Sequence, residues 1–186
     1  MKTKLLLISA ALSCAFAGSA FAMTKAEYSA QKDRISGDYK VAKDKCAALK
    51  ANAKDICKSE AKGIEKVAKA ELEAVYEPSA RRTEKVALAK GDAAYDTAKE
   101  KCDDLSGNAK TVCVKDAKAA YVTVKEEAKL VRAGAMTKKV DASMRKEATA
   151  EEREANYKAA AARCDALSGA PKDACIVDAK TKFGMK

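Results

Sequence analysis

Six of the seven cysteines in this sequence are spaced so that they can do chemistry in pairs. They form three couples, each separated by eleven positions, and every couple lies in one copy of a motif that occurs three times. The copies begin at Tyr39, Tyr95 and Tyr157 and share tyrosine, cysteine, leucine, lysine, acidic and Ala-Lys positions without a gap. Two thiols at a fixed local spacing either oxidise to a disulfide or bind a metal ion as thiolates.

Oxidation to disulfides is the chemistry that the cysteine pattern favours. Six cysteines allow fifteen connectivities, but a repeat in which each copy holds its own couple favours local bridges. The sequence therefore predicts the bridges Cys46–Cys57, Cys102–Cys113 and Cys164–Cys175. A cysteine-based metal-binding or redox-buffering protein is the alternative. Structural zinc prefers four cysteine or histidine ligands, whereas each copy has two cysteines and the chain has no histidine, so no metal or other cofactor is predicted.

Lysines that recur in the motif give the only indication of a partner. The chain has 37 basic and 27 acidic residues and a formal charge of +10, and a basic surface attracts anionic polymers and lipids. The candidate anion-binding residues are Lys54, Lys58, Lys62, Lys66, Lys110, Lys118, Lys172 and Lys180. Acidic residues are interleaved with these lysines, as on an ordinary solvated helix face. The expected partner is a protein or an anionic envelope polymer; sequence-specific nucleic-acid binding is not expected, because no recognition motif is present.

Catalytic patterns do not accompany the repeat. The sequence has no histidine to act as a base, no glycine-rich phosphate loop, no G-x-S-x-G elbow and no Cys-x-x-Cys pair. Adjacent carboxylates such as Asp103 and Asp104 point to different sides of a helix. We therefore do not expect an enzyme.

Helices must position the cysteines and lysines. Apolar residues recur every three or four positions, as in Cys57, Ala61, Ile64, Ala68, Leu72 and Val75, which predicts helices with these residues in the core. Six helices are expected, at about 24–49, 54–76, 79–105, 109–133, 137–167 and 171–183. They form an all-α fold of three disulfide-stapled antiparallel hairpins, at about 24–77, 79–133 and 137–186. These hairpins make one extended domain, either a bundle or an elongated array.

Each bridge also predicts which residues face one another across its hairpin. Small residues meet one step outward, as Ala42 with Ala61, Ala98 with Ala117 and Ala160 with Ala179. Large residues meet beyond them, as Tyr39 with Ile64, Tyr95 with Tyr121 and Tyr157 with Phe183, so the tyrosines are interpreted as core residues.

Local signals mark the helix ends and possible bends. Thr24 and Glu27 match a capping box. In the hairpin links, glycine is expected to end the first helix, Asn108 to cap the second, and Pro171 to lie in a first helical turn. Bends are expected at Gly37, Gly63 and Gly91.

The N-terminus predicts the compartment. Lys2 and Lys4 precede an apolar run, and Ala20-Phe21-Ala22 is typical of a signal-peptidase site, so we expect cleavage after Ala22 and a periplasmic or secreted protein. Losing both lysines lowers the formal charge from +10 to +8. The apolar run is short for a membrane anchor, and no transmembrane segment is expected after cleavage. Lipid attachment at Cys14 is the alternative.

The lysine- and alanine-rich helix 61–71, behind a signal peptide, resembles small exported proteobacterial proteins described as TolA-like. This resemblance is compositional and covers most of the chain after residue 22. It implies an exported helical protein. TolA itself has a transmembrane anchor and a terminal globular domain, neither of which is predicted here. The Leu-Ser-Gly link near the cysteines is also similar to the phosphate-starvation-inducible PsiF repeat, although the cysteine spacing is shorter here. Neither resemblance assigns a site residue.

Overall fold

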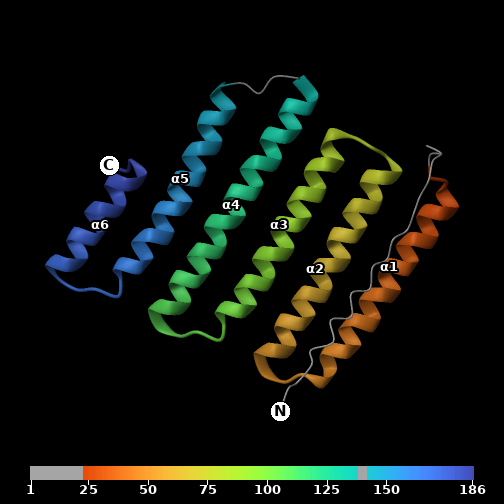
Figure 1. The fold of residues 1–186 in the computed structure, drawn as a ribbon, viewed down its shortest axis with the longest axis horizontal. Coiled ribbons are helices and arrows are strands. Elements are labelled where there is room, and N and C mark those ends of the chain that lie inside the picture. The colour runs from red at the N-terminus through yellow and green to blue at the C-terminus, as the bar shows by residue number, and fades with distance from the viewer. Residues whose placement is uncertain (1–22, 138–141) are drawn as a thin grey trace, which may run out of the picture.

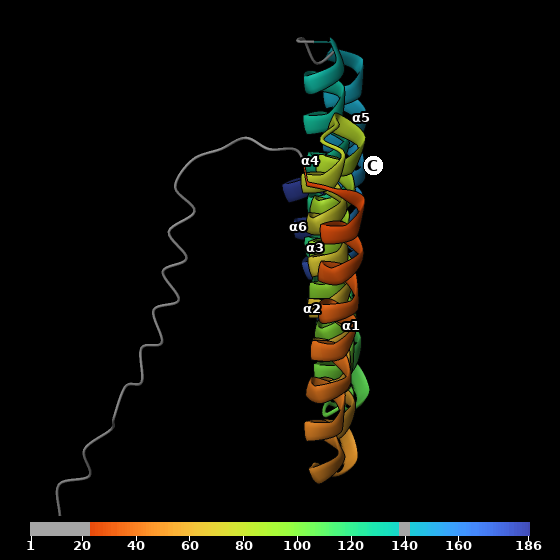
Figure 2. The same cartoon turned by 90° about the vertical axis from the view of Figure 1, so that its right-hand side faces the viewer.

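The described part of the chain folds as six helices laid side by side in a single layer (Figures 1 and 2). The structure is a computed structural model that describes residues 23–137 and 142–186. The helices are α1 (Lys25–Lys45), α2 (Ala51–Tyr76), α3 (Ala80–Cys102), α4 (Gly107–Thr137), α5 (Ala142–Cys164) and α6 (Ala170–Phe183), with a short 3₁₀ turn at Cys46–Ala48. The all-α prediction with six helices is confirmed. The predicted signal peptide at 1–22 lies outside the described residues.

Each helix in the described part of the chain packs only against the helices next to it in sequence. Figure 2, seen along the layer, shows that the fold is one helix thick. Of the two arrangements considered from the sequence, the elongated array is therefore the correct one. Such an array is stabilised by the sum of nearest-neighbour contacts rather than by one central core.

Small residues fill the contacts between the helices. The buried apolar residues are mostly alanines, including Ala61, Ala89, Ala119, Ala159 and Ala179, joined by Leu72 and Val122. The predicted facing residues Ala42 and Ala61 line one hollow together with Tyr39 and Ile64. The rings of Tyr95 and Tyr121 stack with their centroids 5.1 Å apart, which confirms that these two side chains meet.

Two residues that were predicted to lie in the core are exposed instead. The side chains of Ile64 and Val75 are 70% and 62% exposed. In a single layer only the two flanks of a helix are covered, whereas the two broad sides remain open. An apolar stripe with three- and four-residue spacing is wide enough to extend from a covered flank onto an open side.

The starts of α1 and α6 carry the residues that were predicted for them. The Thr24 hydroxyl accepts a hydrogen bond from the Glu27 amide at 3.2 Å, and the Glu27 carboxylate accepts one from the Thr24 amide at 2.8 Å, which confirms the capping box. This backbone hydrogen bond lowers the pKa of Glu27. The Ser79 hydroxyl caps α3 by accepting one hydrogen bond, from the Arg82 amide at 3.3 Å. Pro171 lies in the first turn of α6, as predicted.

The hairpin links differ from prediction in where glycine and asparagine lie. Gly107 has φ +55° and is the first residue of α4, and Gly169 has φ +61° and caps the start of α6. Glycine therefore begins the second helix of these hairpins instead of ending the first. Asn108 lies inside α4 and is not its N-cap. The fourth helix also continues through Gly134 to Thr137, beyond its predicted end.

The first repeat places an alanine where the other two have this glycine. Ala51 has φ +47°, a left-handed conformation that costs an L-residue about 1 kcal/mol. We expect Ala51→Gly to raise the free energy of unfolding by about 0.5 to 1 kcal/mol in denaturant titrations. Ala53→Gly, two positions further into the exposed helix, is the control and should lower the free energy by about 1 kcal/mol. Equal decreases in the free energy of unfolding in both variants would contradict backbone strain at Ala51.

Three glycines inside helices do not interrupt them. Gly37, Gly63 and Gly91 lie within α1, α2 and α3, which run continuously through these positions. Gly63 and Gly91 are buried where neighbouring helices approach closely. A Cβ atom on Gly63 would lie 2.8 Å from the Cβ of Ala93, so this position requires glycine to bring α2 against α3.

Candidate anion-binding surface

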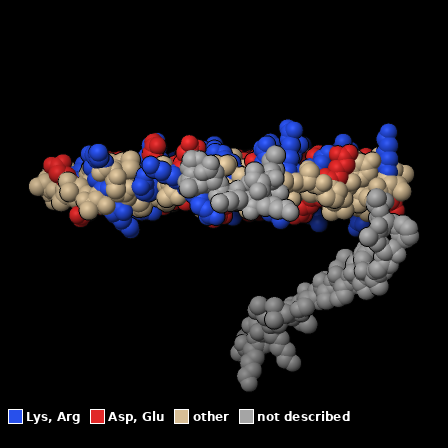
Figure 3. Space-filling view, turned by 90° about the horizontal axis from the view of Figure 1, so that it is seen from above, with Lys and Arg blue, Asp and Glu red and all other residues tan. Residues whose placement is uncertain are grey.

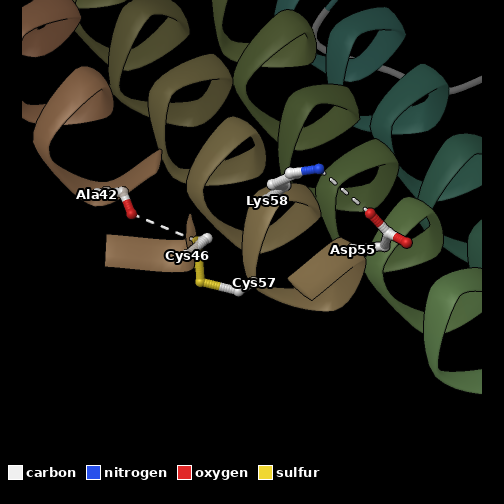
Figure 4. Close-up of a disulfide and its surroundings, with 5 residues drawn as sticks. All are labelled: Ala42, Cys46, Asp55, Cys57 and Lys58. Carbon is white, nitrogen blue, oxygen red and sulfur yellow. Dashed lines mark hydrogen bonds and ion pairs between the residues drawn. A yellow bond between two sulfur atoms is a disulfide. The ribbon is translucent and has the colours of Figure 1, made fainter. Parts of the chain in front are cut away.

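The six cysteines of the repeats form the three predicted disulfides. The bridges are Cys46–Cys57, Cys102–Cys113 and Cys164–Cys175, with Cα atoms 5.6, 5.7 and 5.7 Å apart. Each bridge joins the two helices of a hairpin next to its link. Figure 4 shows the first of them, where Cys46 follows the end of α1 and Cys57 lies in α2.

Paired sulfurs cannot act as thiolate ligands while the bridges are intact. In each bridge the first cysteine is completely buried, with 0% exposure for Cys46, Cys102 and Cys164. Burial of one sulfur limits attack by an external thiol to the other side of the bridge. The bridges therefore have the features of structural disulfides. Of the residues that the sequence analysis singled out for chemistry, this leaves the lysines as candidate ligand contacts.

The α1–α3 part of the layer has two different broad sides. On one side Val41, Ile64, Ala94 and their neighbours line shallow hollows, and we call it the apolar face. Lys62 lies two positions before Ile64 on α2, which turns it by about 200° to the opposite side. That opposite side, which carries Lys43, Lys58, Lys62 and Lys99, is called the basic face. Figure 3, a view down the helices, shows charged side chains of both signs projecting from both sides.

Half of the candidate lysines form ion pairs with neighbouring acidic residues. The Nζ atoms of Lys66, Lys110 and Lys172 lie 2.5, 2.8 and 2.9 Å from Asp92, Asp103 and Asp165, and that of Lys58 lies 3.4 Å from Asp55 (Figure 4). Lys54, Lys62 and Lys180 make no ion pair with a described residue. The candidate lysines therefore form two groups. The paired lysines contact carboxylates of the same protein, whereas the unpaired lysines are available to an external anion.

A polar hollow gathers lysines on the basic face. It has a volume of about 460 Å³ between α1, α2 and α3 and is lined by Tyr39, Lys43, Asp55, Lys58, Ser59, Lys62, Asp96, Lys99 and Glu100. The sequence analysis identified Lys58 and Lys62 but missed Lys43 and Lys99. These two lysines occupy the same motif position, three residues before the first cysteine, so their recurrence in two copies was the available signal.

The basic face continues onto α4 through an aromatic contact. The ammonium of Lys118 lies 5.5 and 5.0 Å from the ring centroids of Tyr95 and Tyr121. This cation–π arrangement holds the lysine beside the stacked rings. The ammonium of Lys99 also lies near this stack, 5.7 Å from the centroid of the Tyr95 ring. Lys118 is therefore positioned by packing rather than by an ion pair.

A partly exposed hydrogen-bond chain supports this part of the face. The Tyr121 hydroxyl donates to Asp92 at 2.6 Å, and Lys66 donates to the other carboxylate oxygen at 2.5 Å. The bond to Asp92, with burial, raises the pKa of Tyr121 to about 12. Burial acts to raise the pKa of Asp92, but the hydrogen bonds from Lys66 and Tyr121 lower it below its usual value. The chain ties α2, α3 and α4 together.

Acidic residues limit the basic face on the side of α5. Glu126 of α4 is buried, with 3% exposure, and pairs with Lys129 at 2.8 Å. Burial raises the pKa of Glu152 on α5, and the charges of Glu127 and Glu126 raise it further. These carboxylates add negative charge where α4 meets α5, which is unfavourable for an anion there.

Comparison of the chain with protein families, with characterised proteins and with solved structures finds no match. Within the described residues, none of the helices combines the length and the hydropathy that crossing a bilayer requires. The function is therefore inferred from the arrangement of the layer itself, in which three disulfides fix the hairpins and a lysine-bearing face is left open on one side.

Proposed function

We propose that the protein is a non-enzymatic binding protein of the bacterial periplasm, and that its basic face binds an anionic envelope component through phosphate groups. The observation that carries this proposal is the gathering of Lys43, Lys62 and Lys99, which form no ion pair with a described residue, around one open hollow. Three disulfides support a location in an oxidising compartment outside the cytoplasm. The net positive charge of the chain favours an anionic partner over a cationic one.

The geometry favours a repeating anion over a single small molecule. The lysines are spread over several helices, and the hollow also contains Asp55, Asp96 and Glu100, so no single enclosed site concentrates positive charge. A polymer or a lipid surface can contact several separate lysines at once. Each lysine near an anionic surface contributes about 1 kcal/mol, and salt screens the interaction.

Charge reversal on each side of the layer tests the proposal. The probes are inorganic polyphosphate and vesicles of phosphatidylglycerol, with phosphatidylcholine vesicles as the neutral comparison. We expect Lys62→Glu to weaken binding to an anionic probe by about tenfold or more, because it replaces an open lysine on the basic face. Lys45→Glu is the control, because it makes the same change of charge beside a hollow of the apolar face, and it should weaken binding less than about twofold.

The two probes distinguish the source of the phosphate. Binding to polyphosphate alone assigns a polymer, and binding to anionic vesicles assigns a lipid headgroup. Equal losses in Lys62→Glu and Lys45→Glu would mean that only net charge matters, and the basic face would then have no special role. A lack of binding to either probe in low salt would leave a protein as the partner and overturn the anionic proposal.

A further inference from the structure

The apolar face of α2 and α3 lacks the second layer that helical domains normally have. Helices bury their apolar stripes against another layer, and isolated single layers leave those stripes in water. Here Ile64 and Val41 are 70% and 56% exposed on this face. An open groove of about 690 Å³ runs between α2 and α3, lined by Gly63, Ile64, Val67, Ala68, Ala93, Ala94, Thr97 and Ala98. An exposed apolar surface of this kind marks an interaction site.

Charged residues border this groove in a regular order. Glu60 and Glu71 lie on α2, and Lys101 and Lys90 lie opposite them on α3, with Nζ to Oε1 distances of 3.2 and 2.8 Å. All acidic members of these pairs are thus on α2 and all basic members on α3. The two acids and the two lysines are each eleven positions apart, which is about 16 Å along a helix. The groove therefore has one negative edge and one positive edge.

If a second copy of the chain is placed on this face by one particular two-fold rotation, the acidic edge of each copy meets the basic edge of the other. We propose that two copies of the chain bind face to face through this groove, with the rotation axis parallel to α2 and α3. The rotation places α2 of each copy over α3 of the other without shifting residues along the helices. Glu60 then faces Lys101 of the second copy, and Glu71 faces Lys90. A two-fold axis across the helices would place Glu60 against Glu71 of the second copy, which is repulsive.

The apolar residues between the charges fit the same arrangement. Ile64 lies about 6 Å above Glu60 along α2, whereas Ala98 and Ala94 lie about 4.5 and 10.5 Å above Lys101 along α3. Ile64 of one copy is therefore placed between the two alanines of the other, a large side chain entering a space between small ones. The two helices, 26 and 23 residues long, present roughly 700 Å² per copy, close to the usual 800 Å² of a stable interface.

Sedimentation equilibrium of the disulfide-bonded protein tests this dimer. We expect a monomer–dimer equilibrium at micromolar concentrations, and we expect Ile64→Glu to weaken the dimer by about 100-fold, because each dimer carries the change twice. Ile64 is exposed in the single chain, so the variant should keep the helical circular dichroism and thermal midpoint of the wild type. Val177→Glu on α6, which alters a residue of similar 59% exposure away from the groove, is the matched control and should dimerise normally.

Cross-linking identifies the orientation. Light and isotope-labelled heavy protein are mixed and joined with a carbodiimide, which links lysine to a touching carboxylate. Mixed light–heavy peptides that join Lys101 to Glu60 and Lys90 to Glu71 support the proposed axis. A protein that stays monomeric at about 100 μM overturns the proposal. A monomer that loses vesicle binding on Ile64→Glu assigns the apolar face to a membrane instead, and a dimer unaffected by Ile64→Glu places the interface elsewhere.

Discussion

We expect removal of the central disulfide by Cys102→Ser with Cys113→Ser to lower the free energy of unfolding by about 3 kcal/mol. The bridge closes a loop of 11 residues, and opening it returns conformational entropy to the unfolded chain. The alanine-lined contacts between helices bury little apolar area, so little other stabilisation compensates. Thermal unfolding should show a lower midpoint, while most of the helical circular dichroism remains at low temperature because the helices have good intrinsic propensity.

Two comparisons isolate the effect of the cross-link. The double alanine variant Cys102→Ala with Cys113→Ala removes the bridge without placing a hydroxyl at the fully buried Cys102, so it separates cross-linking from polar burial. Removing Cys164–Cys175 should reduce cooperative stability less, because α6 packs only against α5 and can unfold locally. A central double variant that melts like the wild type would show that helix packing alone maintains the array.

The second large effect is expected at Gly63. In Gly63→Ala the new Cβ atom would lie 2.8 Å from the Cβ of Ala93 and 3.4 Å from its Cα. Neither atom can rotate away, so α2 and α3 must separate. The loss of packing exceeds the gain in helix propensity, and we expect a net loss of about 1 to 2 kcal/mol in denaturant-induced unfolding.

The chain contains a matched control for this substitution. Gly37 is also inside a helix, but nothing lies within 4 Å of a Cβ atom placed on it. Gly37→Ala should therefore raise the free energy of unfolding by up to about 1 kcal/mol. If Gly63→Ala also raises the free energy of unfolding, α2 and α3 do not approach each other in solution as closely as they do in the structure.

The repeat made the local structure predictable. Because the same spacing occurs three times, the pairing of Cys46 with Cys57 and the meeting of Tyr95 with Tyr121 could be inferred from one register. The capping box at Thr24 is also a short-range feature whose partners lie within one turn. All of these contacts are set within one hairpin or one helix end, where sequence spacing determines distance.

Features that depend on how hairpins pack together were not predictable in the same way. The exposure of Ile64 follows from the absence of a second layer, which the apolar pattern of α2 does not reveal. The pairing of Lys66 with Asp92 joins residues 26 positions apart across the contact between two hairpins. In each case the partner is chosen by tertiary packing rather than by local periodicity.

Each bridge joins one cysteine to the next cysteine along the chain. During synthesis, both thiols of a hairpin therefore emerge before the first thiol of the following hairpin. An oxidase that joins the six thiols of the repeats in their order of appearance produces the three native bridges directly. Since each described helix contacts only its neighbours in sequence, each hairpin can pack against the preceding hairpin as soon as it has formed. The order of the residues along the chain thus serves as the order of assembly.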